Sequence, residues 1–392
     1  MPQPPSSMDK SYKLSTEDHE AIYNNKIAPY YLPRSKPQEH PCAIITGGQP
    51  GAGKSGLTDT AIARFRESGY VLVDADKVRP FHPQYDILME VNDKTAADLT
   101  HGDTAAWSNR LMRDGVAGRR NLIVDQTSRD PVAMTELTQN LRKEGYHIEL
   151  HVMAVSSDVS LLRIDERYEK QRKVHGHGRF SNKDKHDAAY PGVADTVASV
   201  EAGRQVDRLC LYDFNLKPIY ENQLKDGQWQ RDPLARSGLD GERSRLMTPA
   251  EALDHVHKCN ELVSVMEQRN DPQEKDALAA RRERYQKAVT QVATIQSLKE
   301  IEGVARELQT QPLPGGLSAV VERADPQARK PYSGKILATT EHHALQQIGA
   351  NKFIIHDKAG APELTVGKCA TIAYGQAKDA PLGKPKDKGL QR

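Results

Sequence analysis

Aromatic residues are scarce in this chain, at 5% of its 392 residues, and hydrophobic residues of all kinds make up 37%. Aromatic side chains bury large areas and dominate most protein cores. We therefore expect a hydrophobic core over part of the length and not along all of it. A chain of this length is long enough for two or three domains.

Cysteine is also rare. The chain has four, Cys42, Cys210, Cys259 and Cys369, and they are far apart with no C-x-x-C pair. That spacing indicates neither a disulfide framework nor a zinc site. No apolar run reaches the roughly 18 residues that span a bilayer, and the N-terminus has no apolar stretch typical of a secretion signal. We expect a reduced, cytoplasmic compartment and no membrane partner.

No charge of one sign predominates. Lysine and arginine together number 55 and aspartate and glutamate 53, which leaves a formal net charge of +2. Domains that bind nucleic acid usually carry a clear basic excess. The composition therefore does not favour nucleic acid as a partner of the main folded region, and it leaves the partners of the C-terminal region open.

The clearest signal in the sequence is the stretch AIITGGQPGAGKS at residues 43–55, which fits the P-loop pattern G-x-x-x-x-G-K-[ST]. A β-type run precedes it and a helix-compatible run follows, as the motif requires. Glycines let backbone N–H groups turn toward phosphate oxygens, and the helix N-terminus favours the same anion. Lys54 would reach the β- and γ-phosphates of ATP or GTP, and Ser55 would bind Mg²⁺. The predicted nucleotide-binding residues are Gly48, Gln49, Pro50, Gly51, Ala52, Gly53, Lys54, Ser55 and Gly56.

Acidic residues end two further β-type runs. Residues 70–73 are followed by Asp74 and Asp76, and the run NLIVD ends at Asp125. In parallel α/β sheets, ligands bind at the carboxyl ends of the strands. Asp74 and Asp125 are therefore candidates to support the Mg²⁺ held by Ser55.

Strand and helix patterns alternate through residues 42–213, which predicts an α/β fold with a mostly parallel sheet flanked by helices, the architecture of P-loop kinases. Later, Thr248 and Glu251 form a capping-box pattern that predicts the start of a helical region. We expect an N-terminal helix and linker (1–40), a kinase domain (41–225), a linker and helical region (226–325), a small β-rich module (326–376) and a disordered tail (377–392).

Five segments in series resemble the zeta-toxin family: GGQPGAGKS, VDADKVRPFHPQYD, WSNRLM, LIVDQTSRD and VMAVSSDVSLLRIDERYE. The resemblance covers residues 12–220. It implies a P-loop kinase of a toxin–antitoxin system, with an antitoxin protein as partner. It also implies that ATP or GTP phosphorylates the 3′-hydroxyl of the amino sugar of UDP-N-acetylglucosamine, which blocks cell-wall precursor synthesis.

The resemblance also implies roles for single residues. Asp76 stands where the family keeps its general base, and Arg167 and Arg179 stand where arginines face the transferred phosphate. Planar guanidinium donors suit the charge that spreads over phosphate oxygens. The predicted catalytic residues are Asp76, Lys54, Arg167 and Arg179. The predicted substrate-binding residues are Asp76, Arg79, Asn109, Asp125 and Thr127.

The sequence departs from the family at two places. Asp125 stands where the family usually has a glutamate, and residues 111–113 are Leu-Met-Arg where the family often has an acid. A kinase of another nucleotide such as NAD, or of nucleic-acid ends, is therefore an alternative. Arg110 and Arg113 would suit a more phosphate-rich substrate, although a solvated helix face explains them equally well.

The C-terminal segment YSGKILATTEHHALQQ through VGKCATIAYG resembles the KfrB-type domain of plasmid-encoded proteins. That resemblance implies an origin in a plasmid or mobile element and identifies no chemistry. A second class of function is therefore a non-catalytic plasmid maintenance or mobilisation factor, in which the nucleotide site acts as a switch. The acceptor, the preferred triphosphate, the antitoxin, the oligomeric state and the role of residues 226–392 stay open at this point.

Overall fold

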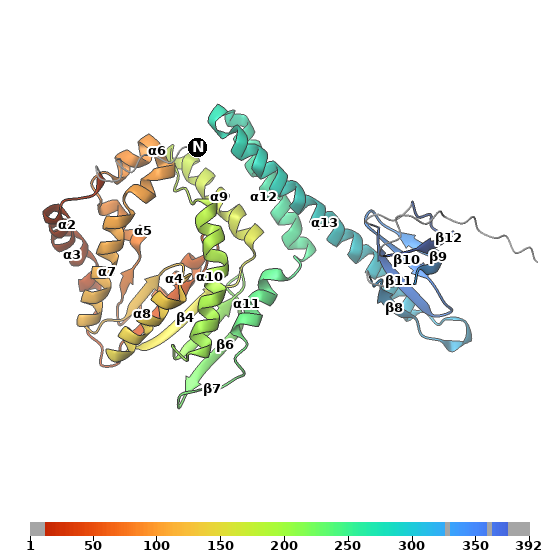
Figure 1. Ribbon diagram of the computed structural model, residues 1–392, viewed down its shortest axis with the longest axis horizontal. Helices are drawn as coiled ribbons and strands as arrows, with labels where there is room; N and C mark the ends of the chain where they lie inside the picture. Colours follow the sequence, from red (N-terminus) through yellow and green to blue (C-terminus); the bar gives the residue numbers. More distant parts are fainter. Residues whose placement is uncertain (1–11, 326–329, 359–362, 375–392) are drawn as a thin grey trace, which may run out of the picture. The chain divides into compact units, whose positions relative to one another are not determined.

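The computed structural model describes residues 12–325, 330–358 and 363–374, and it divides into two compact units, Met1–Arg245 and Leu246–Arg392 (Figure 1). Each unit is described by itself. The predicted disordered tail, 377–392, lies outside the described residues. Among the described helices, none combines the length and the hydropathy that a bilayer span needs.

The first unit contains a seven-stranded sheet in the order β2-β3-β1-β4-β5-β6-β7. The first five of these strands pair in parallel, and the last two add an antiparallel edge. This confirms the predicted α/β fold with a mostly parallel sheet. The strands are β1 (Cys42–Gly47), β2 (Val71–Val73), β3 (Leu122–Asp125), β4 (His147–Met153), β5 (Arg208–Tyr212), β6 (Pro218–Lys225) and β7 (Gln228–Trp229).

Helices cover both faces of this sheet, so its central strands are buried on both sides, as parallel strands are. On one face, Ile45 and Leu150 join a large core with Met134 of α8 and Val197 of α10 (Figure 1). On the other face, Ile44 and Ile123 pack against α4. The helices are α2 (Thr16–Ile22), η1 (Tyr23–Ile27), α3 (Ala28–Tyr31), η2 (Leu32–Arg34), α4 (Lys54–Arg64), α5 (Ala75–Val78), η3 (Arg79–Phe81), α6 (Tyr85–Leu99), α7 (His101–Ala117), α8 (Pro131–Lys143), α9 (Ser157–His175), α10 (Lys183–Ala202) and α11 (Ala235–Ser244).

Helix α6 begins at Tyr85, directly after a proline-containing stretch, and continues through a kink at Asn92 to Leu99. Residues 226–245 were expected to begin a linker, yet they carry β7 and α11. The sequence of α11 is polar and contains glycine, so it does not indicate a core helix. Ala235 and Leu239 of α11 are nevertheless fully buried in the main core.

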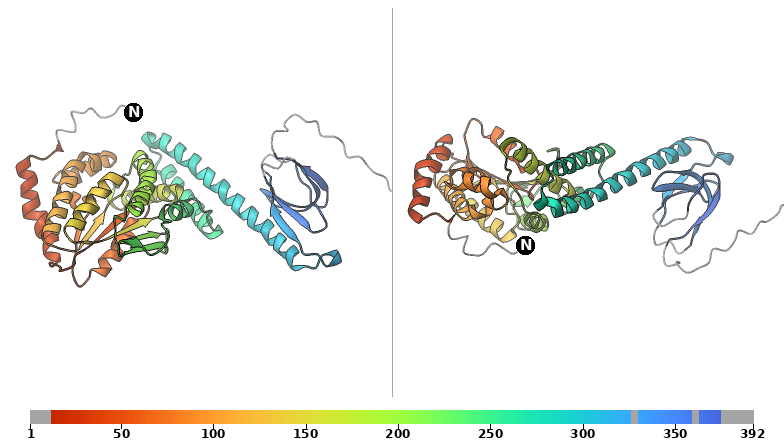
Figure 2. Two further views of the ribbon diagram at one scale, coloured as in Figure 1. Left: turned by 60° about the horizontal axis from the view of Figure 1, so that its bottom comes forward. Right: turned by 90° about the horizontal axis from the view of Figure 1, so that it is seen from above.

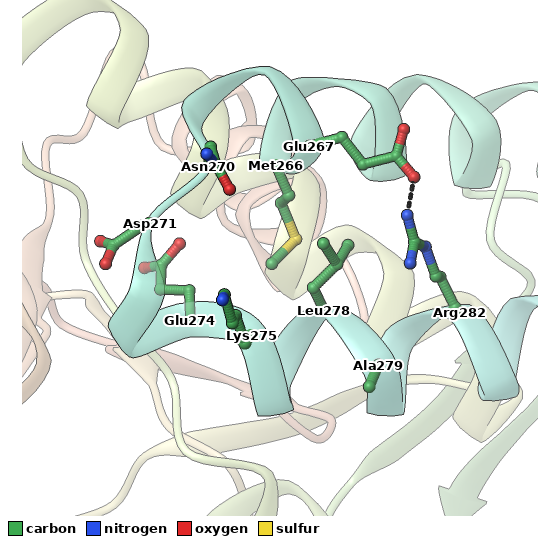
Figure 3. A pocket seen from close by; sticks show the side chains of 9 residues that line it. All are labelled: Met266, Glu267, Asn270, Asp271, Glu274, Lys275, Leu278, Ala279 and Arg282. Atoms are coloured by element: carbon green, nitrogen blue, oxygen red, sulfur yellow. Dashed lines mark hydrogen bonds and ion pairs between the residues drawn. The ribbon is translucent and has the colours of Figure 1, made fainter.

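The second unit begins with two helices that run side by side, α12 (Pro249–Arg269) and α13 (Lys275–Thr310), joined through η4 (Pro272–Glu274) (Figure 2). The predicted capping box is present: Thr248 Oγ1 accepts from the Glu251 N–H, and the Glu251 carboxylate accepts from the Thr248 N–H. At the turn between the helices lies a hollow of about 350 Å³ (Figure 3). Glu267 and Arg282 in its lining form an ion pair with each other, so their charges are already matched.

The second unit ends in a five-stranded sheet in the order β12-β9-β10-β11-β8. Its strands are β8 (Val320–Arg323), β9 (Tyr332–Thr339), β10 (His343–Gln347), β11 (Lys352–Asp357) and β12 (Cys369–Ile372), and η5 (Pro314–Gly316) precedes them. The C-terminal half of α13 covers one face, where Ile301 packs with Leu345 and Phe353. Ser297 Oγ of the same helix lies 2.9 Å from His343 Nδ1. The helix and the sheet therefore share one core.

Candidate functional site

The P-loop joins β1 to α4. Gly51 and Gly53 adopt φ values of +79° and +96°, which other L-residues rarely adopt. A Cβ on Gly51 would lie 2.0 Å from the Ser160 carbonyl oxygen, so a larger residue does not fit there. Lys54 begins α4, and its Nζ donates to the Gly48 carbonyl at 2.8 Å. The lysine therefore folds back over the loop, toward the space that a phosphate chain would fill.

Two predicted nucleotide-binding side chains point into the protein. Gln49 is fully buried and donates from Nε2 to the Val155 carbonyl at 2.8 Å and to Ser160 Oγ at 3.2 Å. Ala52 is also fully buried and packs with Met153. Only the backbone groups of Gln49 and Ala52 can face a ligand.

Charged residues from four elements gather around the Lys54 ammonium. Burial lowers the pKa of Lys54; Arg179 and Arg167 lower it further, while Asp125 and Asp76 raise it. These five groups therefore lie close enough to act on one another electrostatically. They come from α4, from α5, from the end of β3, and from α9 and the loop after it. The geometry thus brings together all four predicted catalytic residues.

The carboxylates at the strand ends are held by local hydrogen bonds. Asp125 Oδ2 accepts from Thr58 Oγ1 of α4 at 3.0 Å. Asp74 caps α5, because its Oδ1 accepts from the Asp76 N–H at 2.8 Å. Burial raises the pKa of Asp74 to about 6, and the nearby charges of Asp125 and Asp76 add to this effect. A bound cation would relieve the electrostatic repulsion among these carboxylates.

Asp76 has two cationic partners. Arg79 Nη2 lies 3.0 Å from Asp76 Oδ1, and Arg179 pairs with Oδ2. Although burial raises the pKa of Asp76, Arg179 and Arg79 lower it more, so the net pKa is below the ordinary value. Arg79 itself is buried and donates to the Ala97 carbonyl at 2.6 Å and to Thr100 Oγ1 at 2.8 Å. Its guanidinium is thus a fixed support for an ionised Asp76.

Arg167 and Arg179 are positioned by polar contacts of α9 and the following loop. Arg167 Nη2 donates to Ser181 Oγ at 2.7 Å, and the Arg179 N–H donates to Gln171 Oε1 at 2.7 Å. Burial lowers the pKa of Arg167 to about 10, with Arg179 contributing in the same direction. Two cations this close to each other favour the arrival of an anion between them.

The remaining predicted residues lie in different surroundings. Thr127 contributes its backbone, because its carbonyl accepts from the Gly48 N–H at 3.1 Å. Asn109 is exposed on α7. Ser55 is exposed in the first turn of α4, where its hydroxyl can reach a cation. Within the described ranges, no group of three or more His, Cys, Asp or Glu side chains could hold a metal alone.

The residues present nevertheless fit Mg²⁺. This cation usually keeps several waters and binds through one or two carboxylates plus substrate phosphates. Ser55 with Asp125 or Asp74 is such a set, and the pKa of Asp74 is raised by burial first and then by the nearby charges of Asp125 and Asp76.

One arginine near the P-loop was not among the predicted site residues. Arg163 lies one turn before Arg167 on α9, and its Nη1 would lie 2.8 Å from a Cβ on Gly53. That buried Nη1 has no hydrogen-bond partner among the described residues. Its guanidinium lies 5.5 Å from the Phe214 ring. The spacing of four residues from Arg167 was the available sequence signal, since it puts both side chains on one helix face.

Comparisons with known proteins identify two matching families. The zeta toxin family model matches residues 30–225, and the KfrB Domain model matches residues 331–380. Toxin PezT of Streptococcus pneumoniae is 26% identical over 193 residues, which cover 48% of this chain and 74% of that toxin. Toxin zeta of Enterococcus hirae is 31% identical over 157 residues, 38% of this chain and 53% of that toxin.

A solved structure from the PezAT chromosomal toxin–antitoxin system of Streptococcus pneumoniae aligns with a TM-score of 0.55 at 20% sequence identity. The alignment covers 64% of this chain and 99% of that chain, and it shows a shared fold. The zeta toxin match spans half of the 392 residues and confirms the resemblance predicted from the sequence. The chain belongs to the zeta-toxin family and carries a C-terminal KfrB domain.

Proposed function

We propose that this chain is a toxin kinase. It binds ATP or GTP with Mg²⁺ at the P-loop and transfers the γ-phosphoryl group to the 3′-hydroxyl of the amino sugar of UDP-N-acetylglucosamine. The observation that carries the proposal is the convergence of an ionised Asp76, Arg167 and Arg179 beside Lys54. A base, a P-loop lysine and two guanidinium groups in one place are the parts that phosphoryl transfer needs.

Each side chain has a distinct task in this proposal. Lys54 exchanges its hydrogen bond to the Gly48 carbonyl for one to the donor phosphates. Arg179, paired with Asp76 before the donor binds, turns to the transferred phosphoryl group together with Arg167. Asp76 then accepts the hydrogen bond of the sugar hydroxyl and takes its proton as the hydroxyl oxygen bonds to the γ-phosphorus and ADP or GDP leaves. Because its pKa is lowered, Asp76 acts mainly by orienting the hydroxyl. Mg²⁺, held by Ser55 with Asp125 or Asp74, would neutralise negative charge on the donor phosphates.

The relatives support the biological setting of the proposal. Two of them are named toxins, and the structural neighbour belongs to a toxin–antitoxin system. We therefore propose an antitoxin protein as partner and the block of cell-wall precursor synthesis as the outcome. Such a nucleotide-sugar substrate would place the activity in the cytoplasm. We also propose that the kinase unit extends to Arg245, because α11 shares its core.

A second acceptor class is favoured by one part of the site. Residues 111–113 are Leu-Met-Arg and offer no carboxylate to a sugar. Leu111 is in addition fully buried in the core. Asp125 already accepts a hydrogen bond from Thr58. A different nucleotide such as NAD, or a nucleic-acid end, is therefore the second candidate. Arg110 does not add to it, because it pairs with Glu20 at 2.5 Å and lies over the Tyr23 ring.

A phosphotransfer assay tests the proposal. The purified chain with ATP–Mg²⁺ is offered UDP-N-acetylglucosamine, NAD or a 5′-hydroxyl oligonucleotide in separate reactions, and Lys54→Ala and Asp76→Asn serve as controls. A phosphorylated sugar nucleotide that is lost in both variants is the expected result. Transfer to NAD or the oligonucleotide alone would keep the kinase and replace the acceptor. Binding of ATP without transfer to any acceptor would favour a nucleotide-dependent switch linked to the KfrB domain.

A further inference from the structure

A buried guanidinium lies directly behind the P-loop. Arg243 of α11 is 7% exposed, and its Nη2 donates to Gln49 Oε1 at 3.0 Å. Its Nη1 donates to the Tyr190 carbonyl at 2.8 Å, and the guanidinium lies 4.1 Å from the centre of the Tyr190 ring. Arg243 and Gln49 are separated by 194 positions in the sequence.

Among the described residues, Arg243 forms no ion pair, and its Nε has no hydrogen-bond partner. Burial lowers the pKa of Arg243 and Arg236 lowers it further, while Tyr190 and Asp240 raise it. A buried charge without a counter-ion destabilises a fold unless something else compensates it. An anion bound on the other side of the loop would do so.

Gln49 connects this cation to the loop. Its side chain accepts from Arg243 and donates to Val155 and to Ser160, so both ends of the amide are engaged. Its backbone carbonyl lies 3.4 Å from Lys54 Nζ. The conformation of the first turn of the P-loop is thus fixed from beneath by the buried side chain of Gln49.

We infer that Arg243 is a positioning residue of the nucleotide site. Through Gln49 it holds the P-loop in its phosphate-binding conformation, and its positive charge, which forms no ion pair among the described residues, favours a nucleoside triphosphate there. Helix α11 lies beyond residue 225, where the zeta toxin match ends. The inference rests on the proposed function in one respect, which is that the ligand of the P-loop is a nucleoside triphosphate.

The full chain allows a matched test on one helix. Arg243→Met removes the buried cation, and Arg243→Lys keeps a charge without the planar fork. Arg236→Met is the control, because Arg236 lies on α11 but is 45% exposed and pairs with Asp195 and Asp240. Calorimetric titration with ATP–Mg²⁺ gives Kd, thermal unfolding gives Tm, and the transfer assay gives KM and kcat separately.

We expect Arg243→Met to raise the Kd for ATP by roughly ten-fold or more, as the loss of a supporting residue behind a binding group does. Arg243→Lys should recover part of this loss, and Arg236→Met should bind ATP as the wild type does. A Met variant with lowered Tm and unchanged Kd would overturn the inference, since it would show a purely structural residue. If Arg243→Met does not fold, an unchanged KM for ATP in Arg243→Lys overturns it instead.

The two proposals fail in different ways. The role of Arg243 is judged on ATP binding, whereas the proposed function is judged on transfer to an acceptor. A wild-type chain that binds ATP but phosphorylates nothing contradicts only the proposed function. A wild-type chain that does not bind ATP at all contradicts both.

Discussion

Replacement of the buried carboxylate Glu149 on β4 should destabilise the first unit. Glu149 is 1% exposed and is surrounded by four donors. Arg64 lies 2.7 Å away, His151 3.0 Å, and His147 and Arg208 3.3 Å. Although burial raises the pKa of Glu149, the hydrogen bonds from these histidines and Arg64 hold it well below its ordinary value. In Glu149→Gln, these donors lose their common anion.

The size of the effect follows from how exposed the partners are. Breaking a buried ion pair by removing one partner costs about 3–5 kcal/mol. The side chains of Arg64 and His147 are 44% and 49% exposed, so water can solvate them after the substitution. His151 is only 7% exposed and cannot be solvated in this way. We therefore expect the free energy of unfolding to fall by about 3 kcal/mol, near the lower end of that range. This corresponds to a decrease of about 6–12 °C in Tm for a unit of this size.

Tryptophan fluorescence during urea unfolding measures this loss selectively. The chain has two tryptophans, and both Trp107 and Trp229 lie in the first unit. The fluorescence signal therefore reports the unfolding of the first unit alone, although the chain consists of two units. Glu221→Gln is the matched control, because Glu221 also pairs with Arg208, at 3.0 Å, but is 36% exposed. An exposed pair of this kind contributes about 1 kcal/mol or less.

The pH dependence gives a second check with a fixed sign. A carboxylate whose pKa is lowered on folding stabilises the fold above its unfolded pKa of about 4.3, and the stabilisation is lost as the pH falls. Glu149 also raises the pKa of His147 through their hydrogen bond, so the difference in stability between wild type and Glu149→Gln should increase from pH 7 to about pH 5 and then shrink below about pH 4. A difference under 1 kcal/mol at pH 7, or one that grows as the pH falls below about 4, would refute this account of the cluster.

Two predictions concern the site itself. Because the pKa of Asp74 is raised to about 6 on folding, its ionisation costs stability that builds up from about pH 4 and is full above about pH 6, so Asp74→Asn should raise Tm at pH 7.5 and leave it unchanged near pH 3. The same variant should lower transfer activity if Asp74 supports Mg²⁺; an unaltered activity across Mg²⁺ concentrations would remove it from the metal site. Arg163→Ala should raise the KM for ATP with little change in kcat, whereas Arg167→Ala should lower kcat by about 10²–10³, the usual loss for a donor to the transition state. Equal effects of the two arginine variants on kcat would contradict their separate roles.

Local patterns in the sequence predicted the centre of the site. The P-loop could be identified because its glycines, lysine and serine are consecutive and sit between a strand and a helix. The strand-end acids Asp74 and Asp125 followed from the rule that parallel strands present their carboxyl ends at one edge. Strand–helix alternation predicted the mostly parallel sheet for the same reason, since each βα unit is a local signal.

Features that depend on distant residues were not accessible in this way. Helix α11 has a polar sequence with glycines, and only its position beside Val200 and Leu211 in the core makes Leu239 a core residue. The bond between Arg243 and Gln49 spans almost the whole first unit, so no window of the sequence contains both. The inward direction of the Gln49 side chain is likewise decided by the neighbouring strand and helix and not by the loop.

The unpaired donors around the P-loop support an anion site independently of any motif. Among the described residues, Arg163 Nη1, Arg167 Nε and Arg179 Nε are buried without a hydrogen-bond partner. A buried donor left unsatisfied costs about 1–3 kcal/mol, and more when the group is charged. Three such donors in one region would be a substantial penalty for a protein that uses them only for its structure. An oxygen-rich polyanion held by Lys54 and the P-loop would satisfy them. The region around the P-loop therefore carries guanidinium donors that the described residues do not satisfy and that a polyanion would satisfy.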